Sequence, residues 1–289
     1  MRVPAPPDPA WRYRLGEIVH DLSCRLLVVG VLPPVAAPGA SGSLDDVLRR
    51  AEVLVAEGAD LLDVGAAGPG PEMGAAEELD RVAPAIEALT ARFDVALSCD
   101  TSRASVLDAA CAAGALVGND VSGFADPDYL AVAARRNASI VVGSVRPAPS
   151  GLDPDPQDDP VRAVETLLGG LASRAEAAGL RPEQICVDPG LDRRTTPAKW
   201  SVLRESAVLA RHGHVLALSV SGPHADDDRH APGLGDCRET SLAAVAYGVM
   251  QGCRVVRVRD VAGSVRVCRM VEAILTHRAA PCAERRVGA

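Results

Sequence analysis

The chain has 289 residues, a mass of 29.9 kDa and 48% hydrophobic residues, which is enough for one large barrel or two small domains. Its formal net charge of −8 argues against nucleic acid as a partner. No apolar run reaches the length of a membrane span, and the N-terminal stretch lacks the apolar centre of a secretory signal. We therefore expect a cytoplasmic protein with no membrane partner.

Strand-like apolar runs alternate with helical patterns along most of the chain. The predicted strands are residues 25–32, 61–64, 95–99, 116–118, 140–142, 185–187, 215–218 and 255–258. The predicted helices are 44–57, 75–92, a stretch that ends at Gly114, 126–136, 160–178, 199–211, 237–251 and 261–276.

Eight strands alternating with helices over about 250 residues are typical of an α/β protein of the (β/α)8 TIM barrel class. The rival fold is a doubly wound open sheet, which usually needs fewer strands. No GxGxxG follows the first strand, which argues against a dinucleotide-binding fold. We predict a loosely ordered, proline-rich leader over residues 1–20, a barrel over 21–278 and a tail over 279–289.

The segment 95–124 predicts a strand, a helix and a second strand with short connections. The two strands should be parallel, which places Asp100 and Asn119 at the same carboxyl edge of the sheet. Each residue also has a purely structural interpretation, because Asp100 could cap the helix and Asn119 could belong to a turn. Asp188 follows a third predicted strand and should lie on the same rim.

The eight cysteines do not indicate a zinc site or a disulfide framework. They occupy positions 24, 99, 111, 186, 237, 253, 268 and 282, and no two of them form a CxxC motif. Several lie within apolar elements, so we expect reduced core thiols. A group of His224, Asp226, Asp227, Asp228 and His230 lacks a second half of any metal motif, and we interpret it as a solvated loop with no metal.

Several short motifs resemble those of dihydropteroate synthase. They are, in chain order, DVG (63–65), EELDRVAPAIEAL (77–89), CDTSRASV (99–106), GALVGNDVSGFADP (114–127), VDPG (187–190) and VVRVRDV (255–261). Their order and spacing match over roughly residues 25–276, and related pterin-binding barrels of methyltransferases fit less completely. The family joins a pterin pyrophosphate to para-aminobenzoate in folate synthesis.

The resemblance implies that Asp100, Asn119 and Asp188 hold a pterin-like small molecule. A pterin presents an amino group and a ring N–H as adjacent donors. A carboxylate accepts both in a bidentate pair, and an amide can bind the remaining edge. Three such groups on three strand ends are the pattern expected of a binding site on a barrel rim.

The chain departs from the family in the half of the site that handles pyrophosphate. Gly30 stands where the family has an asparagine that helps to hold pyrophosphate and Mg²⁺. Residues 67–72, AGPGPE, lack the hydroxyl and the arginine of the family's second loop. Ser221 replaces a lysine that contacts pterin and arylamine, and Lys199, the single lysine, lies on a predicted helix. Arg259 replaces an anion-binding histidine.

Arginines could provide an anion site of different geometry. Arg257 matches the family's arginine and is the candidate catalytic residue, while Arg257 and Arg259 together are candidate anion-binding residues. Arg193 and Arg194, which follow VDPG in place of the family's pattern, are at least as well explained as solvated charges. Mg²⁺ would be the implied cofactor, but its usual ligand position is Gly30.

Two functions are consistent with this pattern. The first is a transferase of dihydropteroate synthase type whose usual activity is weak, lost or redirected to a related substrate. The alternative is a non-catalytic pterin-binding or scaffold homologue. The helix at 237–251 and the last helix are rich in small residues, and the family commonly dimerises through its final helices, so we expect a homodimer.

Overall fold

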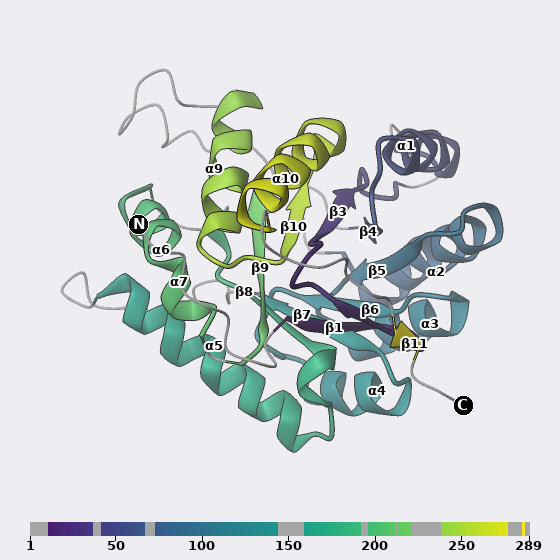
Figure 1. The fold of residues 1–289 in the computed structure, drawn as a ribbon. Helices are drawn as coiled ribbons and strands as arrows, with labels where there is room; N and C mark the ends of the chain where they lie inside the picture. Colours follow the sequence, from purple (N-terminus) through teal and green to yellow (C-terminus); the bar gives the residue numbers. More distant parts are fainter. Residues whose placement is uncertain are drawn as a thin grey trace.

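A closed barrel of parallel strands, surrounded by helices, forms the body of the computed structural model (Figure 1). The structure describes residues 11–36, 42–66, 73–143, 159–191, 196–211, 213–220, 238–276 and 285–286. In these residues the barrel strands are β3 (Leu27–Val31), β4 (Leu61–Val64), β5 (Ala96–Asp100), β6 (Val117–Asp120), β7 (Ser139–Gly143), β8 (Ile185–Asp188), β9 (Val215–Val220) and β10 (Val255–Val258). They pair in chain order, and β10 closes the barrel on β3.

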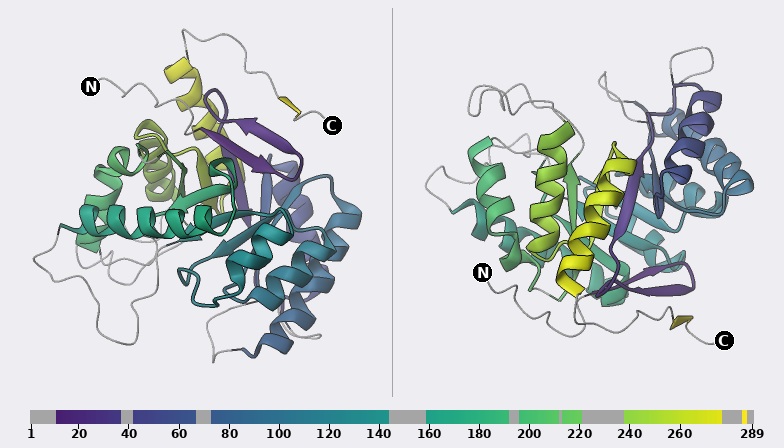
Figure 2. Two further views of the ribbon diagram at one scale, coloured as in Figure 1. Left: turned by 90° about the horizontal axis from the view of Figure 1, so that it is seen from below. Right: turned by 45° about the horizontal axis from the view of Figure 1, so that its top comes forward.

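The outer layer consists of helices that follow the strands (Figures 1 and 2). They are α1 (Leu44–Ala56), α2 (Ala75–Arg92), α3 (Ala104–Ala113), α4 (Tyr129–Arg135), α5 (Pro160–Ala177), α6 (Thr196–Arg204), α7 (Ser206–Leu209), α9 (Arg238–Met250) and α10 (Val261–Thr276). The predicted (β/α)8 class is confirmed. The predicted helix over 199–211 is divided between α6 and α7.

Local sequence explains where the helices begin and which face they bury. Ser43 caps α1 in a capping box with Asp46. Val47, Ala51 and Leu54, spaced at helical intervals on α1, are buried against the barrel. The main core lies between the strands and the helix layer and consists largely of Ala, Val and Leu.

An N-terminal hairpin packs against one end of the barrel (Figure 2). Strand β1 (Arg12–Leu15) pairs antiparallel with β2 (Ile18–Asp21), which also pairs with the short strand β11 (Arg285–Arg286). Tyr13 is buried and donates a hydrogen bond to the carbonyl oxygen of Ile140 on β7. The prediction of a loosely ordered leader over residues 1–20 is therefore wrong for residues 12–20, because alternate side chains of β1 complete the barrel core.

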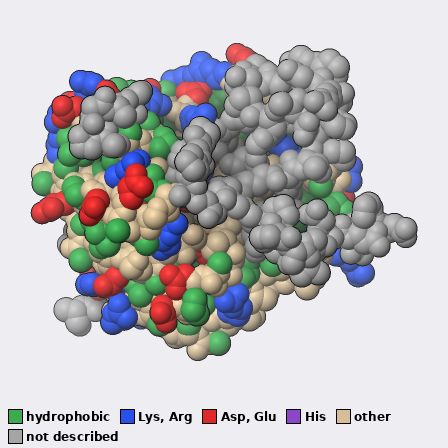
Figure 3. Space-filling model, turned by 180° about the vertical axis from the view of Figure 1, so that it is seen from behind, with side chains coloured by type: hydrophobic (Ala, Val, Ile, Leu, Met, Phe, Trp, Pro, Cys, Tyr) green, Lys and Arg blue, Asp and Glu red, His purple; other side chains and the backbone are tan. Residues whose placement is uncertain are grey.

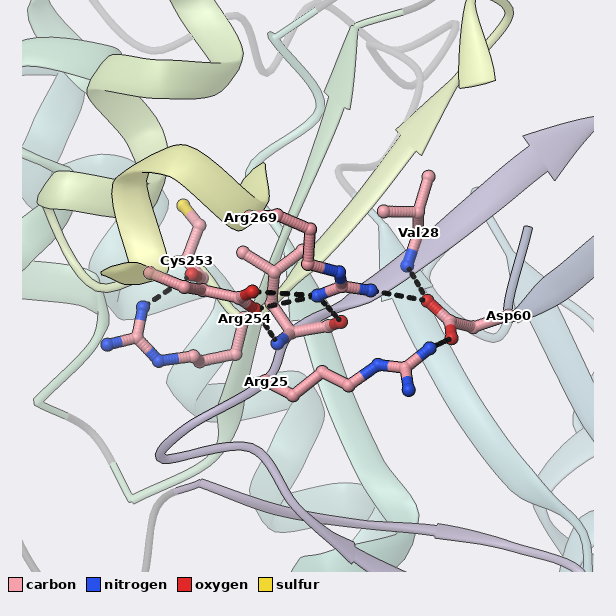
Figure 4. Close-up of polar contacts among 8 residues, drawn as sticks. Arg25, Val28, Asp60, Cys253, Arg254 and Arg269 are labelled. Atoms are coloured by element: carbon pink, nitrogen blue, oxygen red, sulfur yellow. Dashed lines mark hydrogen bonds and ion pairs between the residues drawn. The ribbon is translucent and has the colours of Figure 1, made fainter. Parts of the chain in front are cut away.

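Polar contacts around Asp60 fasten the chain at the end of the barrel that carries the hairpin (Figure 4). One carboxylate oxygen of Asp60 accepts from Arg25 at 2.6 Å, and the other accepts from the backbone N–H of Val28 at 2.9 Å. Arg269 on α10 lies 3.6 Å from the same carboxylate and pairs with Glu272. This network joins the segment before β3 to the last helix.

The surface and the thiols agree with a water-exposed exterior around an apolar core. On the face that Figure 3 shows, acidic and basic side chains are interspersed among apolar ones. Within the described ranges, no helix is both long and apolar enough to cross a membrane. The described cysteines are free thiols, and four of them, Cys99, Cys186, Cys253 and Cys268, are buried.

Candidate functional site

A cavity of about 520 Å³ opens at the carboxyl end of the barrel strands. Residues 31–34, which end β3 and begin the following loop, form its apolar side. Its polar lining comes from other elements: Arg50 of α1, Asp63 of β4, Asp100 of β5, and Arg257 and Arg259 at β10. Enzymes with this barrel place their active sites at this end, so the cavity is the candidate functional site.

Arg257 bridges two carboxylates at the floor of this cavity. Its Nε lies 2.7 Å and its Nη2 lies 2.6 Å from Oδ2 of Asp63, and Nη2 lies 3.0 Å from Oδ2 of Asp100. The Arg257 side chain is 18% exposed, that of Asp63 is 1% exposed and that of Asp100 is 28% exposed. The arginine is therefore charge-compensated before any ligand binds.

Asp63 also holds two neutral polar side chains. Its Oδ1 accepts from the hydroxyl of Ser98 on β5, and its Oδ2 accepts from Nδ2 of Asn119 on β6 at 3.3 Å. All three residues are buried. Asp63 belongs to the DVG motif (63–65), but the sequence did not predict it as a site residue. A charged residue within the buried run Leu61–Val64 was the signal that could have identified it.

Asp188 has its own set of donors at the end of β8. Its Oδ1 accepts from the backbone N–H of Gly190 at 2.7 Å, and its Oδ2 accepts from the hydroxyl of Ser219 on β9. Asp188 and Asn119 line a second, internal cavity of about 20 Å³, which also contacts Asp63 and Arg257. Asp100 instead lines the outer cavity. The predicted pterin residues thus lie on two adjacent cavities that share Asp63 and Arg257.

The local contacts of the central unit argue against the structural alternatives for Asp100 and Asn119. The N-cap of α3 is Arg103, and the N–H of Ala104 donates to Asp126. At the turn after β6, the side chain that accepts from backbone N–H groups is that of Asp120, which binds Ser122 and Phe124. Asp100 and Asn119 lie instead on the cavity walls.

Two cysteines next to the site residues remain protonated at neutral pH. Burial raises the pKa of the Cys99 thiol well above its usual value, and the Asp100 and Asp63 carboxylates raise it further. Burial and the nearby Asp188 raise the pKa of Cys186 in the same direction. Because a thiolate is the reactive form, neither residue is suited to nucleophilic catalysis.

The arginines at the rim form a second feature of the outer cavity. Arg50 donates from Nη2 to the carbonyl oxygen of Arg259 at 2.8 Å, which places these residues side by side. Both line the cavity together with Arg257. Arginine binds phosphate oxygens in a bidentate manner, so this side of the cavity is suited to an anionic group.

The residues of this site do not fit Mg²⁺. A Cβ at position 30 would lie 3.0 Å from Leu54 and 3.2 Å from Val261, so a side chain there would face the helix layer instead of the cavity. The expectation that Gly30 occupies the ligand position is therefore wrong, and residues 31–34, which do line the cavity, carry no polar side chain. Asp63 and Asp100 are bridged by Arg257. In the part of the chain that the structure describes, no cluster of three or more His, Cys, Asp or Glu side chains could hold a metal.

Several sequence predictions fall outside the described residues. They concern the second loop at 67–72, Arg193 and Arg194, Ser221, and the group from His224 to His230. Lys199 lies on a helix, as predicted, although that helix, α6, begins at Thr196 and not at residue 199.

Comparison with known proteins gives consistent matches. The family model for pterin binding enzymes matches residues 35–259. Dihydropteroate synthase of Escherichia coli is 30% identical over 243 residues, which cover 82% of this chain and 86% of that protein. A Mycobacterium bovis protein named inactive dihydropteroate synthase 2 is 35% identical over 239 residues, covering 79% of this chain and 74% of that protein.

A solved structure extends the similarity to the fold. Dihydropteroate synthase from Xanthomonas albilineans in complex with 7,8-dihydropteroate superimposes with a TM-score of 0.79 at 27% identity. The match covers 94% of this chain and 100% of that chain. The similarity therefore spans the barrel and both cavities.

Proposed function

Because the chain belongs to the dihydropteroate synthase family, we propose that it binds a pterin-like small molecule at the carboxyl end of its barrel while the family's usual condensation is weak or absent. The observation that carries this proposal is the difference between the two halves of the site. Acceptors suited to a pterin ring are retained as Asp100, Asn119 and Asp188. The residues with which the family binds pyrophosphate are replaced by others in this chain.

The chemistry of the retained residues supports recognition of a heterocycle rich in donors. Asp100 and Asp188 offer carboxylate oxygens, and Asn119 offers an amide, at the carboxyl ends of β5, β8 and β6. Charge-assisted hydrogen bonds to an amino group and a ring N–H are about twice as strong as neutral ones. A pterin ring presents this donor pair.

Binding of a ring to all three acceptors requires Arg257 to move. The inner cavity of about 20 Å³ is of the order of one water molecule, so a two-ring heterocycle does not fit beside Asn119 and Asp188. Arg257 borders both cavities. A shift of the Arg257 side chain would join the two cavities, because Arg257 and Asp63 line both of them.

The changed half of the site supports loss of the usual reaction. Release of pyrophosphate needs groups that stabilise the charge developing on the leaving group. Residues 31–34, which line the cavity at the end of β3, include no polar side chain, and Arg257 is already paired with Asp63 and Asp100. The similarity to a protein named inactive dihydropteroate synthase 2 is in keeping with this proposal.

The direct test is a titration of the purified protein with pterin alone, followed by pterin fluorescence. We expect saturable binding at a single site per chain. The Asp108→Asn variant serves as a control, because Asp108 lies on α3 and pairs with Arg135 and Arg136 outside the barrel. Absence of saturable binding in the wild-type protein would refute the proposal, whereas unchanged binding in the control variant would support it.

We propose further that the protein is a homodimer that uses α9 and α10. These helices pack side by side (Figure 2). The apolar side chains of Met250, Met270 and Ile274 are exposed to 43%, 63% and 63%. A second copy of the chain could cover this face.

A sedimentation experiment tests this assembly. The wild-type protein is expected to show twice the chain mass at micromolar concentration. Ile274→Glu should shift the protein towards the monomer, since it introduces a charge into an apolar contact. A mass of one chain that is independent of concentration would contradict the proposal.

A further inference from the structure

Both carboxylate oxygens of Asp63 are engaged by groups of the protein. Its Oδ2 accepts from Nε of Arg257 and from Nδ2 of Asn119, and it forms an ion pair with Nη2 of Arg257. Its Oδ1 accepts from the hydroxyl of Ser98. Since the Asp63 side chain is only 1% exposed, Asp63 has little capacity to bind a ligand itself. Its effect must pass through its partners.

The first partner, Arg257, depends on Asp63 for its orientation. Two of its nitrogens approach the same oxygen of Asp63 at 2.7 and 2.6 Å. The other carboxylate, Asp100, is reached by Nη2 at 3.0 Å. If ring donors bind Asp100 and Arg257 shifts, the contact with Asp100 weakens, and Asp63 remains as the buried counter-charge of the guanidinium.

The second partner, Asn119, owes its amide orientation to the same carboxylate. A carboxylate only accepts hydrogen bonds, so the NH₂ group of Asn119 must face Asp63 and its carbonyl oxygen must face away. Asp63 thereby makes Asn119 present an acceptor in the inner cavity, where Asp188 provides a second acceptor. Such a pocket selects ligands that offer several N–H donors.

We infer that Asp63 is a positioning residue that orients Arg257 and Asn119 together and so couples the anion-binding side of the site to the ring-binding side. The preference for a donor-rich heterocycle rests on the proposed function. The orientation of the two side chains is a property of the ligand-free protein and does not depend on it.

Side-chain NMR of the ligand-free protein tests the orientation directly. The measured signals are those of Arg257 Nε–H and of the Asn119 side-chain NH₂. In Asp63→Asn we expect Arg257 Nε–H to exchange with water at least about tenfold faster, because hydrogen bonds to a charged partner are lost. The Asn119 signals should move as well. The backbone amides of β4 and β5 should stay protected from hydrogen exchange in this variant. Such protection would show that the side-chain changes come from lost positioning and not from unfolding.

Two further variants make the result specific. Ser98→Ala removes a donor to Asp63 without changing charge, and it should perturb both signals. Ser98 is hydrogen-bonded to Asp63 and not to Arg257 or Asn119, so a change in the signals of both residues would have to pass through Asp63. Asp60→Asn is the matched control, because Asp60 also pairs with an arginine, Arg25, but lies at the other end of the barrel. This variant should leave both signals unchanged. If Arg257 and Asn119 behave alike in wild type and Asp63→Asn, the inference is wrong.

A pterin titration of the same variants separates the two claims. Asp63→Asn should bind pterin about 10- to 100-fold more weakly than wild type, because orientation of Asn119 and Arg257 is lost. A wild type that binds no pterin, but whose side-chain signals respond to Asp63, would refute the proposed function and support the positioning role. Unaltered side-chain signals would overturn the positioning role whatever the affinity.

Discussion

Purified protein supplied with 6-hydroxymethyl-dihydropterin pyrophosphate and para-aminobenzoate is expected to form dihydropteroate at least about 10⁴-fold more slowly than a true synthase. Removing one preorganised donor from a site of this kind lowers kcat by about 10²–10³. The sequence lacks the family's first-loop asparagine, second-loop hydroxyl and arginine, and the lysine at position 221. Even with strong non-additivity, these losses together should exceed the effect of one donor.

The assay needs a positive control and an independent readout. Dihydropteroate synthase of Escherichia coli, assayed alongside, fixes the scale of normal turnover. Pyrophosphate release provides the second readout. If the protein turns over within about tenfold of the control, rim arginines such as Arg50 and Arg259 have replaced the missing donors, since tenfold is a difference of only about 1.4 kcal/mol. Growth of a strain without its own synthase would lead to the same conclusion.

The second large effect is expected from Asp188. Asp188→Ala should weaken pterin binding by about 100-fold or more, because hydrogen bonds between a ring and a charged acceptor contribute about 1.5–3 kcal/mol each. The substitution also leaves the Gly190 N–H and the Ser219 hydroxyl without their acceptor. Binding measured by pterin fluorescence provides the comparison.

Matched variants separate loss of recognition from loss of structure. Asp188→Asn keeps the size and one acceptor oxygen, and should fall between wild type and Asp188→Ala. Ser219→Ala keeps the carboxylate and should lower affinity less than either. Equal affinity of wild type and Asp188→Ala would show that the ring is not held at the end of β8.

The barrel could be predicted because its signal is repeated along the chain. Eight apolar runs alternate with helical patterns, so errors at single boundaries do not change the fold class. The N-terminal hairpin was missed because a proline-rich stretch precedes it. Its signal was present in the alternation of Tyr13 and Leu15 and in Gly16, which adopts a positive φ of 59° at the turn.

The candidate site residues were named where polar residues follow a predicted strand and missed where they lie within one. Asp100, Asn119 and Asp188 directly follow the predicted strands 95–99, 116–118 and 185–187. Asp63 and Ser98 lie inside the predicted strands 61–64 and 95–99, where a sequence pattern gives no partner. The bridge from Arg257 to Asp63 joins residues 194 positions apart, so only the closure of β10 on β3 brings them together.

The affinity difference between pterin and pterin pyrophosphate, measured by calorimetry on the same preparation, tests the central claim most directly. A site that retains ring recognition but has lost its pyrophosphate donors should bind the two ligands within about tenfold of each other, a difference of about 1.4 kcal/mol. Pterin pyrophosphate that binds more than about 1,000-fold more tightly than pterin would contradict the account, because about 4 kcal/mol would then come from an intact anion site.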